Sequence, residues 1–124
     1  MADRFARLDW EVAVEVTFSI RGERGSIDLL AFHPLERALV VAEMKTVMPD
    51  FQATVSTHDR KTRLGLQVAR DRGWQPRSVS RLLVIERGST ARDRVARVGA
   101  AMDAAYPARG STVRAFLHLS LIHI

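Results

Sequence analysis

A strand–turn–strand segment with charged side chains at its ends constrains this chain more than any other feature. Residues 22–46 read GERGSIDLLAFHPLERALVVAEMKT, in which two apolar runs are separated by a turn at residues 34–37. Apolar runs bounded by turn residues in this way are typical of β-strands. The first run contains Asp28 and the second ends in Glu43 and Lys45. We therefore expect a β-hairpin that carries two carboxylates and an amine.

The register of this hairpin predicts that the two carboxylates lie opposite each other. Folding the strands antiparallel about the middle of the turn sets Asp28 across from Glu43, and opposed residues share a face with Cβ atoms about 5 Å apart. Lys45 lies two residues beyond Glu43 and shares that face. Because opposed like charges repel, the pair favours a bound cation, and two carboxylates suit a hard ion such as Mg²⁺. The alternative is that both acids are solvated beside the turns.

A further strand is predicted before the hairpin, at residues 11–20, where apolar and polar residues alternate. The apolar side chains expected on one face are Val12, Val14, Val16, Phe18 and Ile20. A turn centred between Gly22 and Glu23 leaves Glu15 diagonal to Asp28, within about 7–8 Å. Glu15 is therefore a candidate auxiliary acid, and a solvent-facing glutamate is the alternative.

The rest of the chain predicts helices that alternate with strands. Helices are expected from residue 56 or 57 to 72 and over 90–105, and strands over 79–86 and 113–117. The strand at 79–86 is expected to be more buried than the first one. These elements predict an α/β fold, a mixed sheet with three antiparallel strands at its start and helices beside it. The four histidines show no metal-ligand spacing and are interpreted as structural or incidental.

The composition favours a single domain with a polyanionic partner. A chain of 124 residues is long enough for one core and too short for two. It has no cysteine, which excludes disulfides and thiolate zinc sites. Without an apolar run of about 18 residues or a signal peptide, no membrane association and a cytoplasmic location are expected. The net charge of +5 favours nucleic acid.

The expected domain organisation is one domain followed by a short tail. Residues 1–118 are predicted to form the domain. Residues 119–124, LSLIHI, resemble the translation of a sequencing adapter and are interpreted as a non-native tail. Coding DNA unlike the adapter would contradict that interpretation.

The spacing of Asp28 and Glu43-x-Lys45 resembles the signature of the PD-(D/E)xK nuclease superfamily. More narrowly, the chain is similar to small actinobacterial domains of that superfamily, which are often attached to helix-turn-helix regulators. The resemblance covers about residues 10–117 and includes EVTFS, GERGSIDLLAFHP, EMKT, DRKTRL and RGW. Ile27 stands where the superfamily's name has proline.

This resemblance implies a restriction-endonuclease-like core and metal-dependent cleavage of phosphodiester bonds, in DNA above all. Asp28 and Glu43 would hold Mg²⁺ or Mn²⁺, with Glu15 as an auxiliary. Lys45 would position or deprotonate the attacking water, or stabilise developing negative charge; a salt bridge to either acid is the alternative. Basic side chains of the predicted helix are candidate nucleic-acid contacts, with a solvated helix surface as the alternative: Lys61, Arg60 and Arg63.

Two other functions stay open at this point. The domain could be a catalytically inactive module that keeps the nuclease fold and binds DNA or regulates an attached or neighbouring transcriptional regulator. RNA is a further substrate class. The expected partners are thus nucleic acid, a second copy in a homodimer, and a helix-turn-helix regulator.

Overall fold

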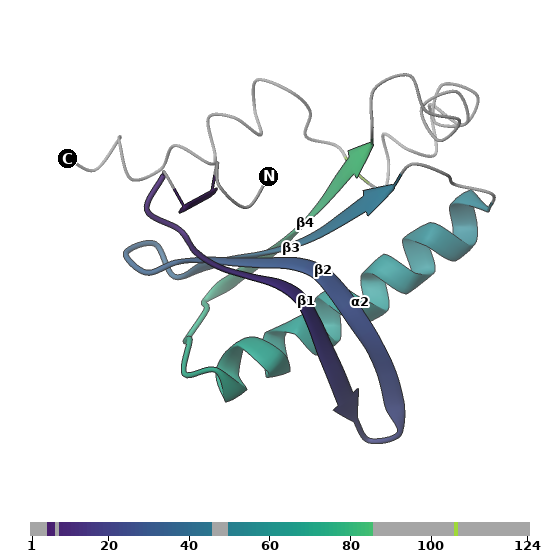
Figure 1. Ribbon diagram of the computed structural model, residues 1–124, viewed down its shortest axis with the longest axis horizontal. Coiled ribbons are helices and arrows are strands. Elements are labelled where there is room, and N and C mark those ends of the chain that lie inside the picture. The colour runs from purple at the N-terminus through teal and green to yellow at the C-terminus, as the bar shows by residue number, and fades with distance from the viewer. Residues whose placement is uncertain (1–4, 7, 46–49, 86–105, 107–124) are drawn as a thin grey trace.

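A four-stranded mixed sheet with one helix across it makes up most of the described part of the chain (Figure 1). The computed structural model describes residues 5–6, 8–45, 50–85 and 106. Its elements are β1 (Glu11–Ile20), β2 (Glu23–His33), β3 (Ala38–Lys45), α2 (Phe51–Asp71) and β4 (Ser78–Ile85). The strand order is β1-β2-β3-β4, with β1 to β3 antiparallel and β4 parallel to β3. The predicted α/β fold with a mixed sheet is confirmed.

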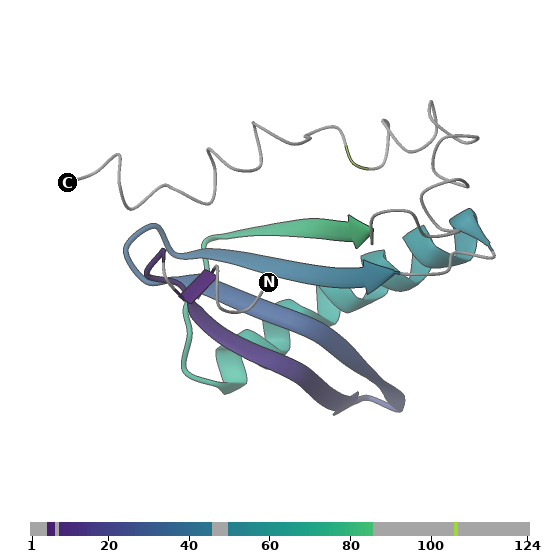
Figure 2. The same ribbon diagram turned by 45° about the horizontal axis from the view of Figure 1, so that its top comes forward.

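The helix α2 lies on one face of this sheet (Figure 2). No helix in the described ranges combines the length and the apolar character that crossing a membrane requires. The helix expected at 90–105, the strand expected at 113–117 and the tail 119–124 lie outside the described residues.

The hairpin of β2 and β3 has the predicted register. Leu29 pairs with Ala42 and His33 pairs with Ala38, which leaves residues 34–37 as the turn. His33 contributes to this turn, because its Nδ1 accepts a hydrogen bond of 3.1 Å from the backbone N–H of Glu36.

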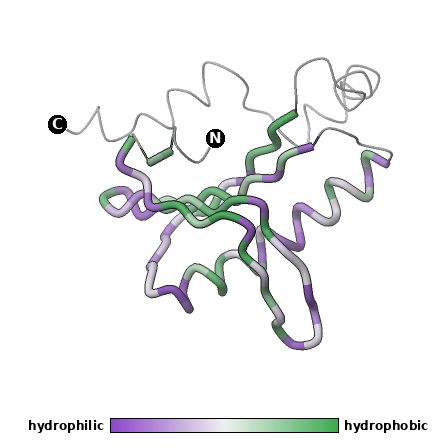
Figure 3. Tube along the Cα trace, in the orientation of Figure 1, coloured by the Kyte–Doolittle hydropathy of each residue, from purple (hydrophilic) through white to green (hydrophobic). Residues whose placement is uncertain are grey.

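Apolar side chains are buried on both faces of the central strands, and Figure 3 shows that hydrophobic residues predominate along the central part of the sheet. Strands that are buried on both faces have continuous apolar runs in their sequence. The side that faces α2 is here called the helix-side core, and it contains Phe18, Ile27, Leu30, Phe32, Leu39, Val41, Leu64, Val68 and Ala69. The other face is covered by Phe5 and Trp10 from the N-terminal segment.

The turn between β1 and β2 is centred one residue earlier than predicted, between Arg21 and Gly22. Ile20 pairs with Glu23, so Arg21 and Gly22 alone form the turn, and both have positive φ, +50° and +81°. Two-residue turns with positive φ at both positions are of type I′, which matches the twist of a hairpin. The predicted register of this pair was therefore wrong by two residues.

This turn gives a first prediction. The Gly22→Ala variant is expected to lose about 1 kcal/mol of unfolding free energy, because an L-residue is strained in the left-handed region. No atom lies within 4 Å of the added Cβ, so strain alone is tested. The Arg21→Asn variant is the control, and it should be more stable than the wild type because Asn tolerates this conformation. Urea denaturation measures both, and equal midpoints for the two variants would contradict the turn type.

The alternation along β1 does not run unbroken, contrary to the prediction. Val16 packs against the helix-side core whereas Val12 packs on the opposite face, and Val14 is 56% exposed. The change of face falls at Glu15, whose φ is +49°. β2 changes face at the same level, since Ile27 belongs to the helix-side core and Leu29 to the other cluster.

The helix begins earlier than predicted. Asp50 is the N-cap, with φ −139°, and its Oδ1 accepts a hydrogen bond of 3.1 Å from the N–H of Ala53. An aspartate in this position satisfies a backbone donor that the first turn leaves free. The predicted start at residue 56 or 57 was wrong, and the predicted end was right, because Gly73 follows the helix with φ +87°.

The strand β4 is partly buried. Its first three residues are exposed and its last five are half-buried. Its neighbour in the sheet is β3 alone, so β4 is an edge strand in the described part of the chain. Three of its eight residues are exposed, against five of ten in β1, so by the share of exposed residues β4 is the more buried of the two strands, as expected.

Candidate functional site

The sheet divides at the level of Asp28 and Glu43. Pairing of β2 with β3 begins at Leu29 and Ala42. Before that level β2 pairs only with β1, while Glu43 and the two residues after it pair with β4. Figure 1 shows the hairpin of β1 and β2 diverging from β3 and β4. This divergence is here called the fork, and it leaves backbone N–H groups of both strands without a ladder partner.

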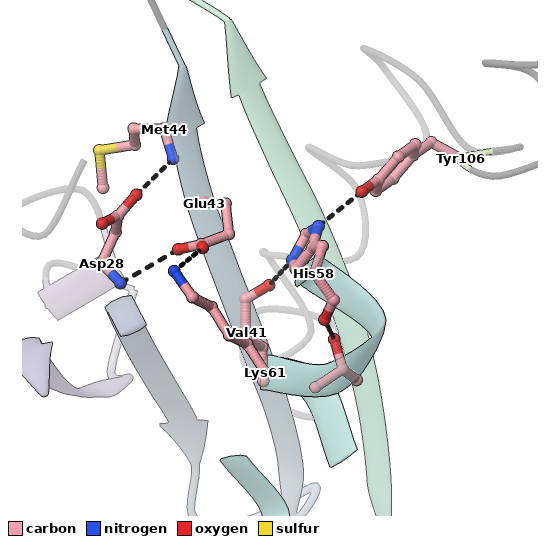
Figure 4. Close-up of polar contacts among 8 residues, drawn as sticks. Asp28, Val41, Glu43, Met44, His58, Lys61 and Tyr106 are labelled. Carbon is pink, nitrogen blue, oxygen red and sulfur yellow. Dashed lines mark hydrogen bonds and ion pairs between the residues drawn. The ribbon is translucent and has the colours of Figure 1, made fainter. Parts of the chain in front are cut away.

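The two carboxylates close the fork by bonding to each other's strand. The N–H of Asp28 donates to Glu43 Oε2 at 3.2 Å, and the N–H of Met44 donates to Asp28 Oδ2 at 2.8 Å (Figure 4). The register that continues from Leu29 and Ala42 therefore brings Asp28 and Glu43 together as the sequence predicted. Bonds of this charge-assisted kind are stronger than neutral hydrogen bonds.

Glu43 is the buried member of the pair. Its side chain is 2% exposed, and its Oε1 forms an ion pair with Nζ of Lys61 from α2. Burial raises the pKa of Glu43, and the contacts with Lys61 and with the Asp28 N–H oppose that rise. These partners offset part of the cost of burying the carboxylate, because an unpaired buried charge is costly.

Lys45 and Lys61 have different surroundings. Lys45 lies two residues after Glu43 on β3, on the face that α2 covers, and is half-buried. Its charge contributes to lowering the pKa of His58 on α2. Among the described residues the cation paired with Glu43 is Lys61, not Lys45. The salt bridge considered for Lys45 is thus made by the helix lysine.

A buried histidine lies beside these groups. His58 is 1% exposed, and its Nε2 bonds to the carbonyl oxygen of Val41 at 2.9 Å. Because a carbonyl only accepts, Nε2 carries the proton, and Nδ1 accepts from the Tyr106 hydroxyl at 2.6 Å. Arg81 lies over the Tyr106 ring, 4.8 Å from its centroid, and pairs with Asp59. His58 is therefore a structural link between β3, α2 and Tyr106, and not an incidental residue.

His58 was predicted to be structural or incidental, although the sequence contained a signal for its place against β3. His58 and Lys61 are three residues apart and therefore share a helix face. That face continues to Leu64 and Val68, which pack in the helix-side core. With a helix that begins at Phe51, this spacing places both polar side chains against β3.

Protonation of His58 gives a second prediction. Burial lowers the pKa of His58, against the raising effect of its bond to the Val41 carbonyl. Three nearby cations lower the pKa further: Arg81, Lys61 and Lys45. As pH falls below about 6.5, the ordinary histidine pKa, the unfolded chain binds a proton that the folded chain excludes. The unfolding free energy should therefore decrease in this range.

Comparison of wild type with His58→Gln isolates this effect, because His33 and Glu43 are present in both proteins. Urea denaturation between pH 7.5 and 5.5 should show a steeper loss in the wild type. Parallel losses in the two proteins would contradict the assignment.

The remaining predicted residues lie outside this cluster or at its border. Glu15 falls between the pairs formed by Val14 with Leu29 and Val16 with Ile27, so it lies level with Asp28, and it is exposed. Arg63 pairs with Glu23 at 3.2 Å and is 63% exposed. Arg60 is half-buried on α2.

The donor set of the cluster fits a cation that keeps most of its water. In the described part of the chain no three or more His, Cys, Asp or Glu side chains are grouped to hold a metal. Asp28 and Glu43 provide two carboxylates, and Mg²⁺ is commonly held by one or two carboxylates, waters and substrate phosphate. Oε1 of Glu43 forms an ion pair with Lys61. A cation that binds Asp28 and this oxygen of Glu43 together therefore requires the ion pair to break.

Comparisons with protein-family models, with curated proteins and with solved structures give no match for this chain.

Proposed function

We propose that the fork is the active site of a metal-dependent nuclease that cleaves phosphodiester bonds in DNA. One observation carries the proposal: Asp28 and Glu43, from neighbouring strands, each accept a hydrogen bond from the other's strand, and Lys61 forms an ion pair with Glu43. The net charge of +5 favours a polyanionic substrate. The superfamily resemblance of Asp28, Glu43 and Lys45 supports the same function.

Each residue has a distinct role in this proposal. Asp28 and Glu43 would hold Mg²⁺ or Mn²⁺ through their carboxylates, and their backbone hydrogen bonds fix the direction of each carboxyl group. A bound ion of this kind lowers the pKa of water and neutralises charge on a phosphate. Lys45 would hold the attacking water or stabilise the charge that develops on the phosphate. Exposed Glu15, level with Asp28, would bind outer waters.

Cleavage of plasmid DNA tests this function. The purified protein is expected to nick plasmid DNA with Mg²⁺ and to stop when EDTA is added. The Asp28→Asn and Lys45→Met variants should be slower by about 10²-fold or more, the usual effect of losing an electrostatic group at a reaction centre. Asparagine still offers an oxygen to the N–H of Met44, which preserves the fork.

The Asp71→Asn variant is the matched control, because Asp71 is an exposed acid at the far end of α2. It should cleave as the wild type does. Equal cleavage by all four proteins would show that a contaminant or another site is responsible.

A DNA-binding or regulatory module without catalysis is the second candidate. It is favoured by the contacts of Glu43, whose two oxygens already have partners, Lys61 and the N–H of Asp28. These two contacts can stabilise the fork without any bound metal, which is what a module without catalysis requires. Calorimetry separates the candidates: Mg²⁺ binding that is lost in Glu43→Gln supports the nuclease, and DNA binding without a response to Mg²⁺ supports the module.

A further inference from the structure

The chain has two lysines: Lys61 forms an ion pair with Glu43 and Lys45 lies two residues after Glu43 on β3, and the other residues of the lysine and arginine total are arginines. Lys45 comes from β3 and Lys61 from α2, and the sequence has 19 lysines and arginines in all. An ammonium is a compact point charge on a flexible stem, whereas a guanidinium is a planar fork that holds carboxylates in a fixed geometry. A lysine at each position is therefore better suited than an arginine to leave one anionic partner and bind another.

Lys61 occupies the position that a cation would take at Glu43. Its Nζ contacts Oε1, while the side chain is 14% exposed and Glu43 is 2% exposed. Figure 4 shows the ammonium reaching from α2 to the carboxylate beside Asp28. The pair thus neutralises the buried acid of the fork from the helix side.

We propose that Lys61 is an exchangeable counter-ion: it neutralises Glu43 while no divalent ion is bound, and it turns to a substrate phosphate once such an ion binds. This inference rests on the proposed function and adds Lys61 to it as a substrate-positioning residue. An ammonium that stays at Glu43 would lie within a few ångströms of a dication, where like charges repel strongly in a site of low dielectric. A phosphate bound at the same ion offers the displaced ammonium a new anion.

Burial and side-chain length make this exchange feasible. Lys61 lies one helical turn from His58 and one from Leu64, which anchor its backbone against β3 and the helix-side core. The backbone therefore stays in place while the four-carbon stem rotates. Lys45, on the strand, would stay beside the attacking water, so the two amines have separate roles.

Lysine footprinting of the wild-type protein tests the exchange. The reagent is N-acetoxysuccinimide, used at low extent so that each molecule is modified at most once, and mass spectrometry resolves the two sites. In metal-free protein Lys61 should react more slowly than Lys45. With excess Mg²⁺, Lys61 should react about tenfold faster or more, since a charge-assisted hydrogen bond has been lost. Adding a DNA oligonucleotide with Ca²⁺ should protect Lys61 again.

The controls separate this inference from the proposed function. Calorimetry that detects Mg²⁺ binding while the Lys61 rate stays constant would overturn the exchange and leave the nuclease proposal intact. Absence of Mg²⁺ binding to the wild type would overturn both. Asp28→Asn should lose the Mg²⁺ response of Lys61, and a response that persists would place the ion elsewhere and overturn the exchange. A Lys61 rate that stays high with DNA and Ca²⁺ would overturn its contact with phosphate.

Discussion

The Lys61→Met variant is expected to lose about 3–5 kcal/mol of unfolding free energy at neutral pH, the usual cost of removing one partner from a buried ion pair. Methionine retains much of the length of the lysine stem, so the loss reports the charge rather than a cavity. Glu43, at 2% exposure, is left without its cation. Because burial already raises the pKa of Glu43, the loss should shrink as pH falls and the carboxyl takes up a proton.

The double variant Glu43→Gln/Lys61→Met is the control for this effect. It removes both charges and keeps an oxygen for the N–H of Asp28, so it should be more stable than Lys61→Met alone. Glu43→Gln alone should cost less than Lys61→Met, since the lysine at 14% exposure can reach water. Urea denaturation at pH 8 and pH 5 measures all four proteins. Additive losses in the double variant would show that the two side chains are not coupled.

The Leu30→Ala variant is expected to lose about 2–5 kcal/mol, the range for truncating a fully buried leucine. Leu30 has no exposed surface and belongs to the helix-side core. A Cβ on Gly65 would lie 3.5 Å from its Cδ2, which shows how closely α2 packs on this strand. The cavity would form where the helix meets the sheet, beside Val41.

Leu35→Ala is the matched control, because Leu35 lies in the turn after β2 and is 75% exposed. The same truncation there should change the unfolding free energy by less than about 0.5 kcal/mol. Chemical denaturation followed by tryptophan fluorescence compares the two, since Trp10 and Trp74 are partly or fully buried. Similar losses at both positions would contradict the assignment of the core.

The hairpin of β2 and β3 was predictable because its information is local. The turn at residues 34–37 fixes which residues pair, and a slip by one residue would move the apolar side chains to the other face. The approach of Asp28 to Glu43 followed from this register alone. The nuclease activity, the DNA substrate, the metal, the homodimer and the regulator stay predictions.

Features that depend on an unusual backbone angle or on contacts distant in sequence were predicted poorly. The change of face at Glu15 was missed because alternation was continued through a residue in the left-handed region. The partner of Glu43 was missed because Lys61 is 18 residues away and its helix was predicted to begin too late. If Asp50 had been recognised as the N-cap, the helix would have been predicted to begin at Phe51. His58 and Lys61 would then have been predicted to lie on the helix face that packs against β3.

The fork has a mechanical consequence for the two acids. The ladder that starts at Leu29 and Ala42 brings them together, and beyond it the bonds from Asp28 N–H to Glu43 and from Met44 N–H to Asp28 join their two strands. Hydrogen bonds to charged groups contribute about 1.5–3 kcal/mol each to stability. This is far less than the total contribution of the buried side chains in the helix-side core. Rupture of these two bonds would therefore separate the strands at the fork at a lower cost than disruption of the ladder or of the packing under α2.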